Sequence, residues 1–322
     1  MKAFVYGANG AAITDVAQPA PKGSQVLVRV RACGLNRADL GMTKGHAHGS
    51  AGGAGTVLGM EWAGEIAEVG PDAKGVKIGD RVMGSGAAAF AEYTLADYGR
   101  LFQAPAGMSF EVAATLPLAL TTMHNALVTN GQLQAGQSVL IQGASSGVGL
   151  MALQIAKLKG AKTVIGSSTD ATRRGRLHEF GADLAIDSRD AGWVDQVLKA
   201  TDGDGVDLIV DQVSGNLVNQ NLAATKVLGR IVNVGRLGGT HGDFNFDLHA
   251  ARRISYIGVT FRTRTIEEIR EIFRQVRNDI WPAVESGKLR LPIDSTFAFA
   301  DIAAAFARMD ANQHLGKIVV TL

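Results

Sequence analysis

The strongest constraint on the fold lies in the middle of the chain, where short apolar runs alternate with segments of helical length. An apolar run at 138–143 is followed by a helical pattern at 149–160 and by a second apolar run at 162–167. A second helical pattern stands at 172–182, and further apolar runs stand at 184–187, 206–213 and 229–235. This alternation predicts repeated strand–helix–strand units, and therefore an α/β fold with a parallel sheet covered by helices.

The two ends of the chain have a different pattern. Residues 25–34 alternate apolar and polar side chains, as a half-buried strand does. Two strongly amphipathic helices are predicted at 265–287 and 299–312, and a closing strand at 316–322. These features are typical of a mixed, β-rich domain.

The length of 322 residues is too great for one hydrophobic core and favours two domains. We expect a β-rich domain formed by residues 1–118 and 260–322. Residues 119–259 would form a dinucleotide-binding α/β domain inserted into it.

Composition excludes several classes of function. The net charge of +2, from 32 basic and 30 acidic residues, gives no reason to expect a nucleic acid or an anionic membrane as partner. Cys33 is the only cysteine, which excludes an internal disulfide and a four-cysteine zinc site. No signal peptide is evident and no uninterrupted apolar run approaches the length of a membrane span, so a cytoplasmic location is expected.

A glycine-rich turn, Gly143–Gly149, joins the first central strand to its helix. Small residues let a backbone approach a pyrophosphate, and the start of a helix offers unpaired N–H groups. The turn alone fits a phosphate cradle and a plain strand–helix connection equally well. In the cradle interpretation, the residues that bind the cofactor are Ser145, Ser146, Gly147 and Val148.

The end of the next strand indicates which nucleotide the cradle would hold. Folds that bind NAD usually place an acidic residue there, on the ribose hydroxyls. This chain has Ser167 and Ser168 instead, with Asp170 beyond them and Arg173 shortly after. Serine hydroxyls and an arginine suit a 2′-phosphate, so the prediction is NADPH, although such an arginine is also common on a solvated helix face.

Seven blocks in order along nearly the whole chain resemble the medium-chain dehydrogenase/reductase superfamily. The resemblance is closest to its zinc-free quinone oxidoreductase branch, the zeta-crystallin-like NADPH:quinone reductases. The blocks are CGLNRADL (33–40), LGMEWAGEIAEVG (58–70), KIGDRVMG (77–84), FAEYTLA (90–96), GASSGVG (143–149), GRIVNVG (229–235) and NQHLGKIVVTL (312–322).

The resemblance implies a Rossmann-type domain inserted into a GroES-like catalytic domain. Zinc-dependent relatives bind catalytic zinc with a cysteine and a histidine, and the matching positions here are Asn36 and Met60. Neither an amide nor a thioether suits a tetrahedral zinc site, so no metal is expected. Without one, conjugated acceptors such as quinones and enones are favoured over simple ketones, because they delocalise the negative charge that develops on oxygen.

The resemblance also implies further site residues, each with a plainer alternative. Asn36 would lie beside the nicotinamide, or it is a turn asparagine bonded to its own backbone. Thr122 would contact the cofactor near the same ring, or it is a hydroxyl at a helix start. Gly235 ends a strand where ligands bind in α/β sheets. Asn312 would reach the cofactor, or it ends a helix.

The sequence therefore predicts a zinc-independent oxidoreductase that transfers hydride from NADPH to a quinone or α,β-unsaturated carbonyl compound. The alternatives are an enoyl-thioester reductase and an NADPH-binding protein with a mainly non-catalytic role. Some relatives carry a tyrosine proton donor where this chain has His46 and His48, which leaves the identity of the proton donor open.

The apolar run 254–261 is the strand along which two copies of the chain are predicted to pair as a homodimer.

Overall fold

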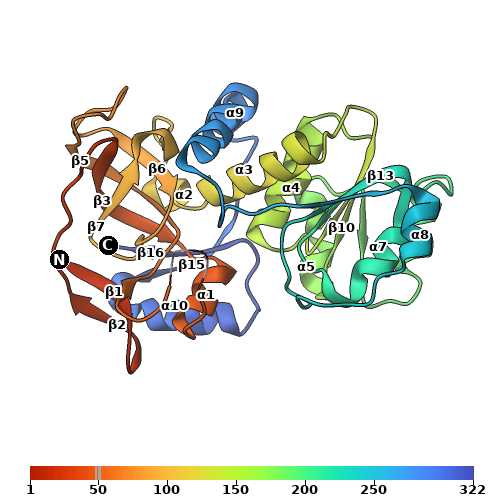
Figure 1. Cartoon of the computed structure of the whole chain (residues 1–322), viewed down its shortest axis with the longest axis horizontal. Coiled ribbons are helices and arrows are strands. Elements are labelled where there is room, and N and C mark those ends of the chain that lie inside the picture. Colours follow the sequence, from red (N-terminus) through yellow and green to blue (C-terminus); the bar gives the residue numbers. More distant parts are fainter. Residues whose placement is uncertain (48, 50–51) are drawn as a thin grey trace. The chain divides into compact units, whose positions relative to one another are not determined.

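The computed structural model describes residues 1–47, 49 and 52–322. The chain divides into two compact units, and each is described by itself. The first unit comprises residues 1–121 and 261–322, and the second comprises residues 122–260. The chain passes from the first unit into the second within helix α3 (Pro117–His124), which is labelled in Figure 1.

The first unit is built around a mixed sheet with the strand order β15-β16-β3-β5-β6-β8, to which β7 adds on β3. A three-stranded sheet, β2-β1-β4, completes the strands described for this unit. The bounds are β1 (Lys2–Gly7), β2 (Gly10–Asp15), β3 (Gln25–Gly34), β4 (Thr56–Val57), β5 (Glu61–Val69), β6 (Arg81–Ser85), β7 (Tyr93–Asp97), β8 (Leu101–Gln103), β15 (Ile293–Ala298) and β16 (Lys317–Thr321).

Helices pack against these strands as the amphipathic patterns predict. The two C-terminal helices are confirmed as α9 (Ile266–Glu285) and α10 (Ile302–Asp310). Phe306 of α10 stacks on Phe4 at 5.7 Å between ring centroids and meets the edge of Phe90 at 5.8 Å. The shorter helices are α1 (Arg37–Thr43) and α2 (Phe110–Ala113).

The second unit contains the parallel sheet that the sequence predicts. Six strands lie in the order β11-β10-β9-β12-β13-β14, and every neighbouring pair is parallel. The bounds are β9 (Ser138–Gln142), β10 (Thr163–Ser167), β11 (Leu184–Ile186), β12 (Val206–Asp211), β13 (Thr225–Asn233) and β14 (Ser255–Gly258).

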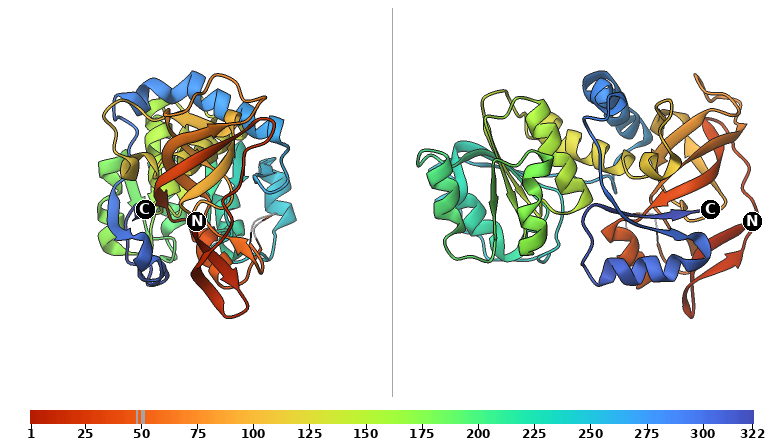
Figure 2. Two further views of the ribbon diagram at one scale, coloured as in Figure 1. Left: turned by 90° about the vertical axis from the view of Figure 1, so that its left-hand side faces the viewer. Right: turned by 180° about the vertical axis from the view of Figure 1, so that it is seen from behind.

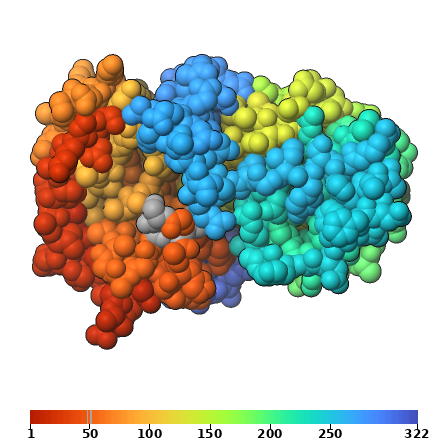
Figure 3. Space-filling model, viewed as in Figure 1, coloured from red at the N-terminus to blue at the C-terminus, as the bar shows by residue number. Residues whose placement is uncertain are grey.

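Helices cover both faces of this sheet (Figures 1 and 2). Helix α4 (Gly147–Leu158) packs on β9 and β10, while α6 (Trp193–Ala200), α7 (Val218–Ala224) and α8 (Phe246–Arg252) contact one another in series. Helix α8 and the segment before it (cyan) lie at the surface in Figure 3. The strand order turns back between β9 and β12, and ligands of open α/β sheets bind at such a switch point, beyond the carboxyl ends of the strands.

Two segments of the second unit differ from the expected pattern. The helix predicted near 172–182 is broken into α5 (Ala171–Gly175) and a 3₁₀ turn (Leu177–Phe180), because Gly175 and the left-handed Gly181 interrupt it. The apolar run 254–261 forms only the four-residue strand β14.

One helical stretch of the chain is both long and apolar. Among the described residues, the stretch 110–130 is long and apolar enough to cross a membrane by length and composition, with a mean hydropathy of 1.2. Glutamate, threonine, histidine and asparagine residues interrupt its apolar side chains, so it is not an uninterrupted apolar run. About 72% of its most apolar window is buried inside the structure, as in the core helices of globular domains.

Candidate active site

The glycine-rich turn connects β9 to α4 at the switch point. Ser146 caps α4, since its Oγ accepts a hydrogen bond of 3.0 Å from the N–H of Gly149. A Cβ atom at Gly149 would lie 2.6 Å from the carbonyl oxygen of Gly143, so only glycine fits there. The N–H groups of Gly147 and Val148 have no acceptor in the part of the chain that the structure describes. They open the helix, where its dipole favours an anion.

A second loop holds this turn in place from across the switch point. The single proton of the Ser146 hydroxyl is shared between the carbonyl oxygen of Gly143 at 2.9 Å and Oε1 of Gln212 at 3.1 Å. Nε2 of Gln212 donates to the carbonyl oxygen of Gln142 at 3.1 Å. Gln212 directly follows β12, so these bonds join the carboxyl ends of β9 and β12. Sequence reasoning missed Gln212, because nothing in the local pattern distinguishes it from a loop glutamine.

The two serines at the end of β10 lie in different surroundings. Ser167 is buried, and its hydroxyl donates to Oε1 of Gln142 at 2.6 Å and accepts from the N–H of Gly143 at 3.0 Å. These bonds fix the start of the turn. The Ser168 hydroxyl meets that of Ser145 at 3.0 Å, so the predicted cofactor residues of the turn and of the strand end are brought together.

Basic side chains surround the end of β10, but each has an acidic neighbour. Arg174 donates to the carbonyl oxygen of Ser168 at 2.9 Å and pairs with Asp187 at 3.1 Å. Arg173 lies 3.6 Å from Asp170, which also caps α5. Asp187 pairs with Arg189 as well, and hydrogen bonding from Arg189 lowers the pKa of Asp187. The three arginines and two aspartates around the end of β10 together carry a net positive charge.

Gly235 lies beyond the end of β13, packed against Gln212. A Cβ atom at Gly235 would stand 2.7 Å from the carbonyl oxygen of Gln212, so the residue must be small. The Ser214 hydroxyl donates to the carbonyl oxygen of Gly235 at 2.7 Å. Gly235 thereby joins the loops that follow β12 and β13.

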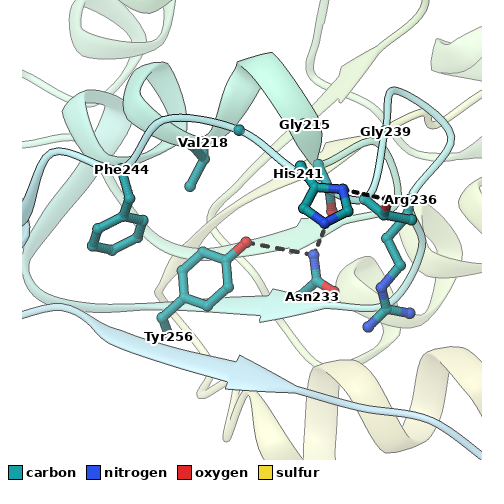
Figure 4. Close-up of a pocket in the computed structure, with 11 residues that line it drawn as sticks. Gly215, Val218, Asn233, Arg236, Gly239, His241, Phe244 and Tyr256 are labelled. Atoms are coloured by element: carbon teal, nitrogen blue, oxygen red, sulfur yellow. Dashed lines mark hydrogen bonds between the residues drawn. The ribbon is translucent and has the colours of Figure 1, made fainter.

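A cavity of about 240 Å³ opens beside this loop, on the face of the sheet that carries α7 (Figure 4). Asn233 donates to the Tyr256 hydroxyl at 3.4 Å and to the hydroxyl of Ser214, and all three side chains line the cavity. Arg236 and His241 complete its polar wall. No sequence motif pointed to this cavity, because its residues come from separate strands and a glycine-rich loop.

In the first unit, Asn36 lies at the end of β3, where two neighbouring strands bring charged groups to it. Oδ1 of Asn36 accepts a hydrogen bond of 2.8 Å from Nζ of Lys317, the first residue of β16. Nδ2 of Asn36 lies 3.2 Å from Oε2 of Glu61, the first residue of β5. Lys317 and Glu61 pair at 2.5 Å, and both are buried. Nδ2 of Asn36 also donates to the carbonyl oxygen of Gly34 at 3.2 Å.

These surroundings do not fit a zinc ion. The ammonium of Lys317 lies against Asn36, the first of the two positions at which zinc relatives hold the metal, and would repel a dication. Met60, at the second position, packs against the hydrophobic core. No cluster of three metal-ligating side chains occurs in the described ranges. Cys33 is buried with its thiol on the carbonyl oxygen of Ala89 at 2.9 Å, and burial raises the pKa of that thiol well above its ordinary value.

Thr122, Asn312 and His46 are the remaining predicted residues that the structure describes. Thr122 is in the middle of α3 rather than at its start, and it is half-buried. Asn312 follows α10 with a left-handed φ of 52°, and its Oδ1 accepts from Arg37 at 2.9 Å. His46 is exposed, and His48 lies outside the described residues.

Two family models match the chain. The alcohol dehydrogenase GroES-like domain matches residues 22–106, and the zinc-binding dehydrogenase domain matches residues 147–278. Together with the fold, they define a dehydrogenase of the medium-chain dehydrogenase/reductase superfamily, with a GroES-like domain and a parallel-sheet Rossmann domain. Oxidoreductases of this superfamily bind nicotinamide cofactors.

Individual relatives narrow the assignment. Human quinone oxidoreductase is 30% identical over 312 residues, which cover 96% of this chain and 92% of that protein. The chain therefore belongs to the zinc-free quinone oxidoreductase branch of the superfamily. A phenolphthiocerol/phthiocerol polyketide synthase from Mycobacterium tuberculosis is 31% identical over 96% of this chain, which spans only 14% of that protein's length. The structure of CurK enoyl reductase superposes with a TM-score of 0.87 at 26% identity and covers 99% of both chains.

Proposed function

We propose that this protein transfers hydride from NADPH to a quinone or another α,β-unsaturated carbonyl compound without a metal. The observation that carries the proposal is the Lys317 ammonium on Asn36, at a position where a zinc-dependent relative would bind its metal. Without a Lewis acid, acceptors that spread their developing charge over a conjugated system are favoured. The similarity to human quinone oxidoreductase supports the same class of acceptor.

The second unit would hold the dinucleotide at its switch point. The N–H groups of Gly147 and Val148, together with Ser145, would bind the pyrophosphate. Ser146 is committed to capping α4 and to Gln212, so its part is to shape the cradle. When bound, the nicotinamide supplies the hydride, and the chain's own residues orient the ring and hold the acceptor.

The preference for NADPH over NADH rests on the end of β10. Ser168, Arg173 and Arg174 offer hydroxyl and guanidinium donors there. The 2′-phosphate would share these arginines with Asp170 and Asp187. The phosphate can compete with these two carboxylates for the arginines, because the ion pairs are partly exposed and surface pairs of this kind are weak.

The direct test is steady-state oxidation of NADPH and of NADH with 1,4-benzoquinone, 9,10-phenanthrenequinone and crotonyl-CoA. We expect turnover of the quinones, with a higher kcat/KM for NADPH than for NADH. Tight binding of NADPH without turnover of any acceptor would instead favour the mainly non-catalytic role.

An enoyl-thioester reductase is the second candidate, and two specific similarities favour it. A segment of the polyketide synthase matches nearly the whole of this chain, and the CurK enoyl reductase has the same fold. Faster turnover of crotonyl-CoA than of either quinone would select this alternative.

We also infer that two copies of the chain associate along β14. This strand is the last in the sheet order, and its outer edge has no partner strand among the described residues. Tyr256 of β14 and nearby Phe246 are exposed, 37% and 76% respectively. Sedimentation equilibrium should give the mass of two 33.7 kDa chains, and a mass of one chain would refute the dimer.

A further inference from the structure

Four buried side chains of the second unit form one continuous chain of hydrogen bonds that ends at the glycine-rich turn. Nδ2 of Asn221, in α7, donates to Oδ2 of Asp211 at 3.1 Å, and Nε2 of Gln142 donates to Oδ1 of Asn221 at 2.8 Å. The Ser167 hydroxyl donates to Oε1 of Gln142 at 2.6 Å and accepts from the N–H of Gly143 at 3.0 Å. Each of the four side chains is at most 1% exposed, so water cannot replace these bonds. The chain therefore links the carboxyl ends of β12, β9 and β10 to the first residue of the turn.

Asp211, the last residue of β12, is where this chain of hydrogen bonds begins. Its Oδ1 accepts from the N–H groups of Val213 and Ser214 at 2.8 and 2.9 Å, and its Oδ2 accepts from Asn221. Burial raises the pKa of Asp211, and these hydrogen bonds oppose the rise because they favour the charged form. A carboxylate has no proton to give, so Asn221 must turn its Nδ2 toward it.

The direction of every later bond follows from that first one. With Nδ2 on Asp211, Asn221 has only Oδ1 left for Gln142, which must then present its Nε2. Gln142 is left with Oε1 toward Ser167, so the Ser167 hydroxyl gives its single proton there. A lone pair of Ser167 then receives the N–H of Gly143. The charge on Asp211 thus determines which atom Ser167 presents to the turn.

We propose that Asp211 and Asn221 are positioning residues for the dinucleotide, which fix the direction of the chain so that Ser167 holds the turn and offers no proton to the 2′-phosphate. This inference rests on the proposed function, because the turn is the proposed cradle for the pyrophosphate. Neither Asp211 nor Asn221 is accessible to a cofactor, so both act only through Gln142 and Ser167. The hydroxyl at the end of β10 that would serve the 2′-phosphate is that of Ser168.

The first test is Asp211→Asn, which reverses the chain at almost constant volume. The new amide would donate to Oδ1 of Asn221, both later amides would turn over, and Ser167 would become an acceptor only. The Ser167 proton would then be buried without an acceptor, and the turn would have to shift to supply one. We expect the Kd of NADPH, measured by isothermal titration calorimetry, to rise about tenfold, and that of NADH by the same factor.

Combining Asp211→Asn with Asn221→Asp moves the carboxylate one position along the chain. The carboxylate at position 221 would accept from the amide at position 211 and from Nε2 of Gln142, so the bonds of Gln142 and Ser167 would return to their original direction. Asn221→Asp alone sets two buried carboxylates against each other and should weaken binding most. We therefore expect the double variant to bind NADPH more tightly than either single variant does.

Alanine variants distinguish the two hydroxyls at the end of β10. Ser167→Ala should raise the Kd of NADPH and of NADH by the same factor, because it removes a support of the turn that both cofactors need. Ser168→Ala should raise the Kd of NADPH more than that of NADH. A loss of affinity for NADPH alone in Ser167→Ala would show that Ser167 contacts the 2′-phosphate and would overturn the proposal.

Asp195→Asn is the matched control, because it removes the same charge at an exposed position of α6 and should leave both constants unchanged. The Tm of each variant is measured without cofactor alongside, and the double variant should regain what Asp211→Asn loses. If Asp211→Asn does not fold, recovery of folding and binding in the double variant decides in the same way.

Two further results would overturn the proposal. One is an unchanged Kd for Asp211→Asn, and the other is losses that multiply in the double variant, which would show that each residue acts only locally. Failure of the wild type to bind either nucleotide would sink the proposed function. The Tm comparison needs no cofactor, and it would still decide whether Asp211 sets the direction of the chain.

Discussion

Ser146 and Gln212 stand 66 residues apart in the sequence, yet their side chains form a hydrogen bond of 3.1 Å across the switch point of the parallel sheet. The bond ties the cap of α4 to the loop that follows β12. Gln212 further donates to the carbonyl oxygen of Gln142. The shape of the cradle therefore depends on a side chain outside the glycine-rich turn.

Replacing Gln212 should weaken cofactor binding without destroying the fold. Gln212→Leu keeps the volume and removes the bonds to Ser146 and Gln142, so we expect NADPH Kd to rise by about three- to tenfold. Isothermal titration calorimetry would measure it. Gln134→Leu, at an exposed glutamine of the same unit, is the control. An unchanged Kd for Gln212→Leu would show that the turn holds its shape alone.

Removing either arginine near β10 should weaken NADPH binding selectively. Arg173→Ala and Arg174→Ala each remove a charged donor for a 2′-phosphate, which is worth roughly tenfold or more in Kd. NADH, which lacks that phosphate, should bind as before. Arg176→Ala is the matched control, because Arg176 pairs with Glu179 on the exposed surface. Tighter binding of NADH than of NADPH by the wild type would contradict the assignment.

The activity should survive chelation. With Lys317 on Asn36 and a thioether at Met60, we expect zinc well below one atom per chain after dialysis against EDTA, at unchanged kcat/KM. Inductively coupled plasma mass spectrometry measures the metal. Stoichiometric zinc that resists chelation would refute the zinc-free site.

Stability should fall as the pH rises toward neutrality, because of one buried carboxyl. Burial raises the pKa of Asp39 from 3.8 to about 7, against the opposing effects of the Asn36 N–H and of Lys317, and with Glu61 adding to the rise. The folded chain thus binds a proton that the unfolded chain has lost, so the stabilisation is complete below about pH 4 and is lost between pH 4 and 7.

Asp39→Asn should flatten that dependence. The amide oxygen can still accept from the N–H of Asn36, as Oδ2 of Asp39 does at 2.8 Å, but it carries no charge at any pH. We expect the variant to melt a few degrees above the wild type at pH 8, since about 1 kcal/mol shifts Tm by roughly 2–4 °C in a domain of about 150–250 residues. Differential scanning calorimetry at pH 5 and 8 measures both. Parallel pH profiles for the two proteins would contradict the prediction.

Local patterns predicted much of this molecule because they depend on near neighbours in the chain. The apolar runs that became β9, β10, β12 and β13 carry their own periodicity, and the capping serine and required glycine of the turn lie within a few residues of each other. The helix near 172–182 was predicted less well, because its glycines override the apolar pattern.

The sequence by itself determined the parallel sheet, the glycine-rich turn that follows one of its central strands, and the absence of zinc ligands at Asn36 and Met60. Only the tertiary structure showed that the amide of Asn36 hydrogen-bonds to Lys317, 281 positions further along the chain, and to Glu61. It also showed that Gln212 hydrogen-bonds to Ser146. The physical reason is that strand pairing joins residues distant along the chain. Which side chains then meet at a strand end depends on register, and no local pattern encodes it.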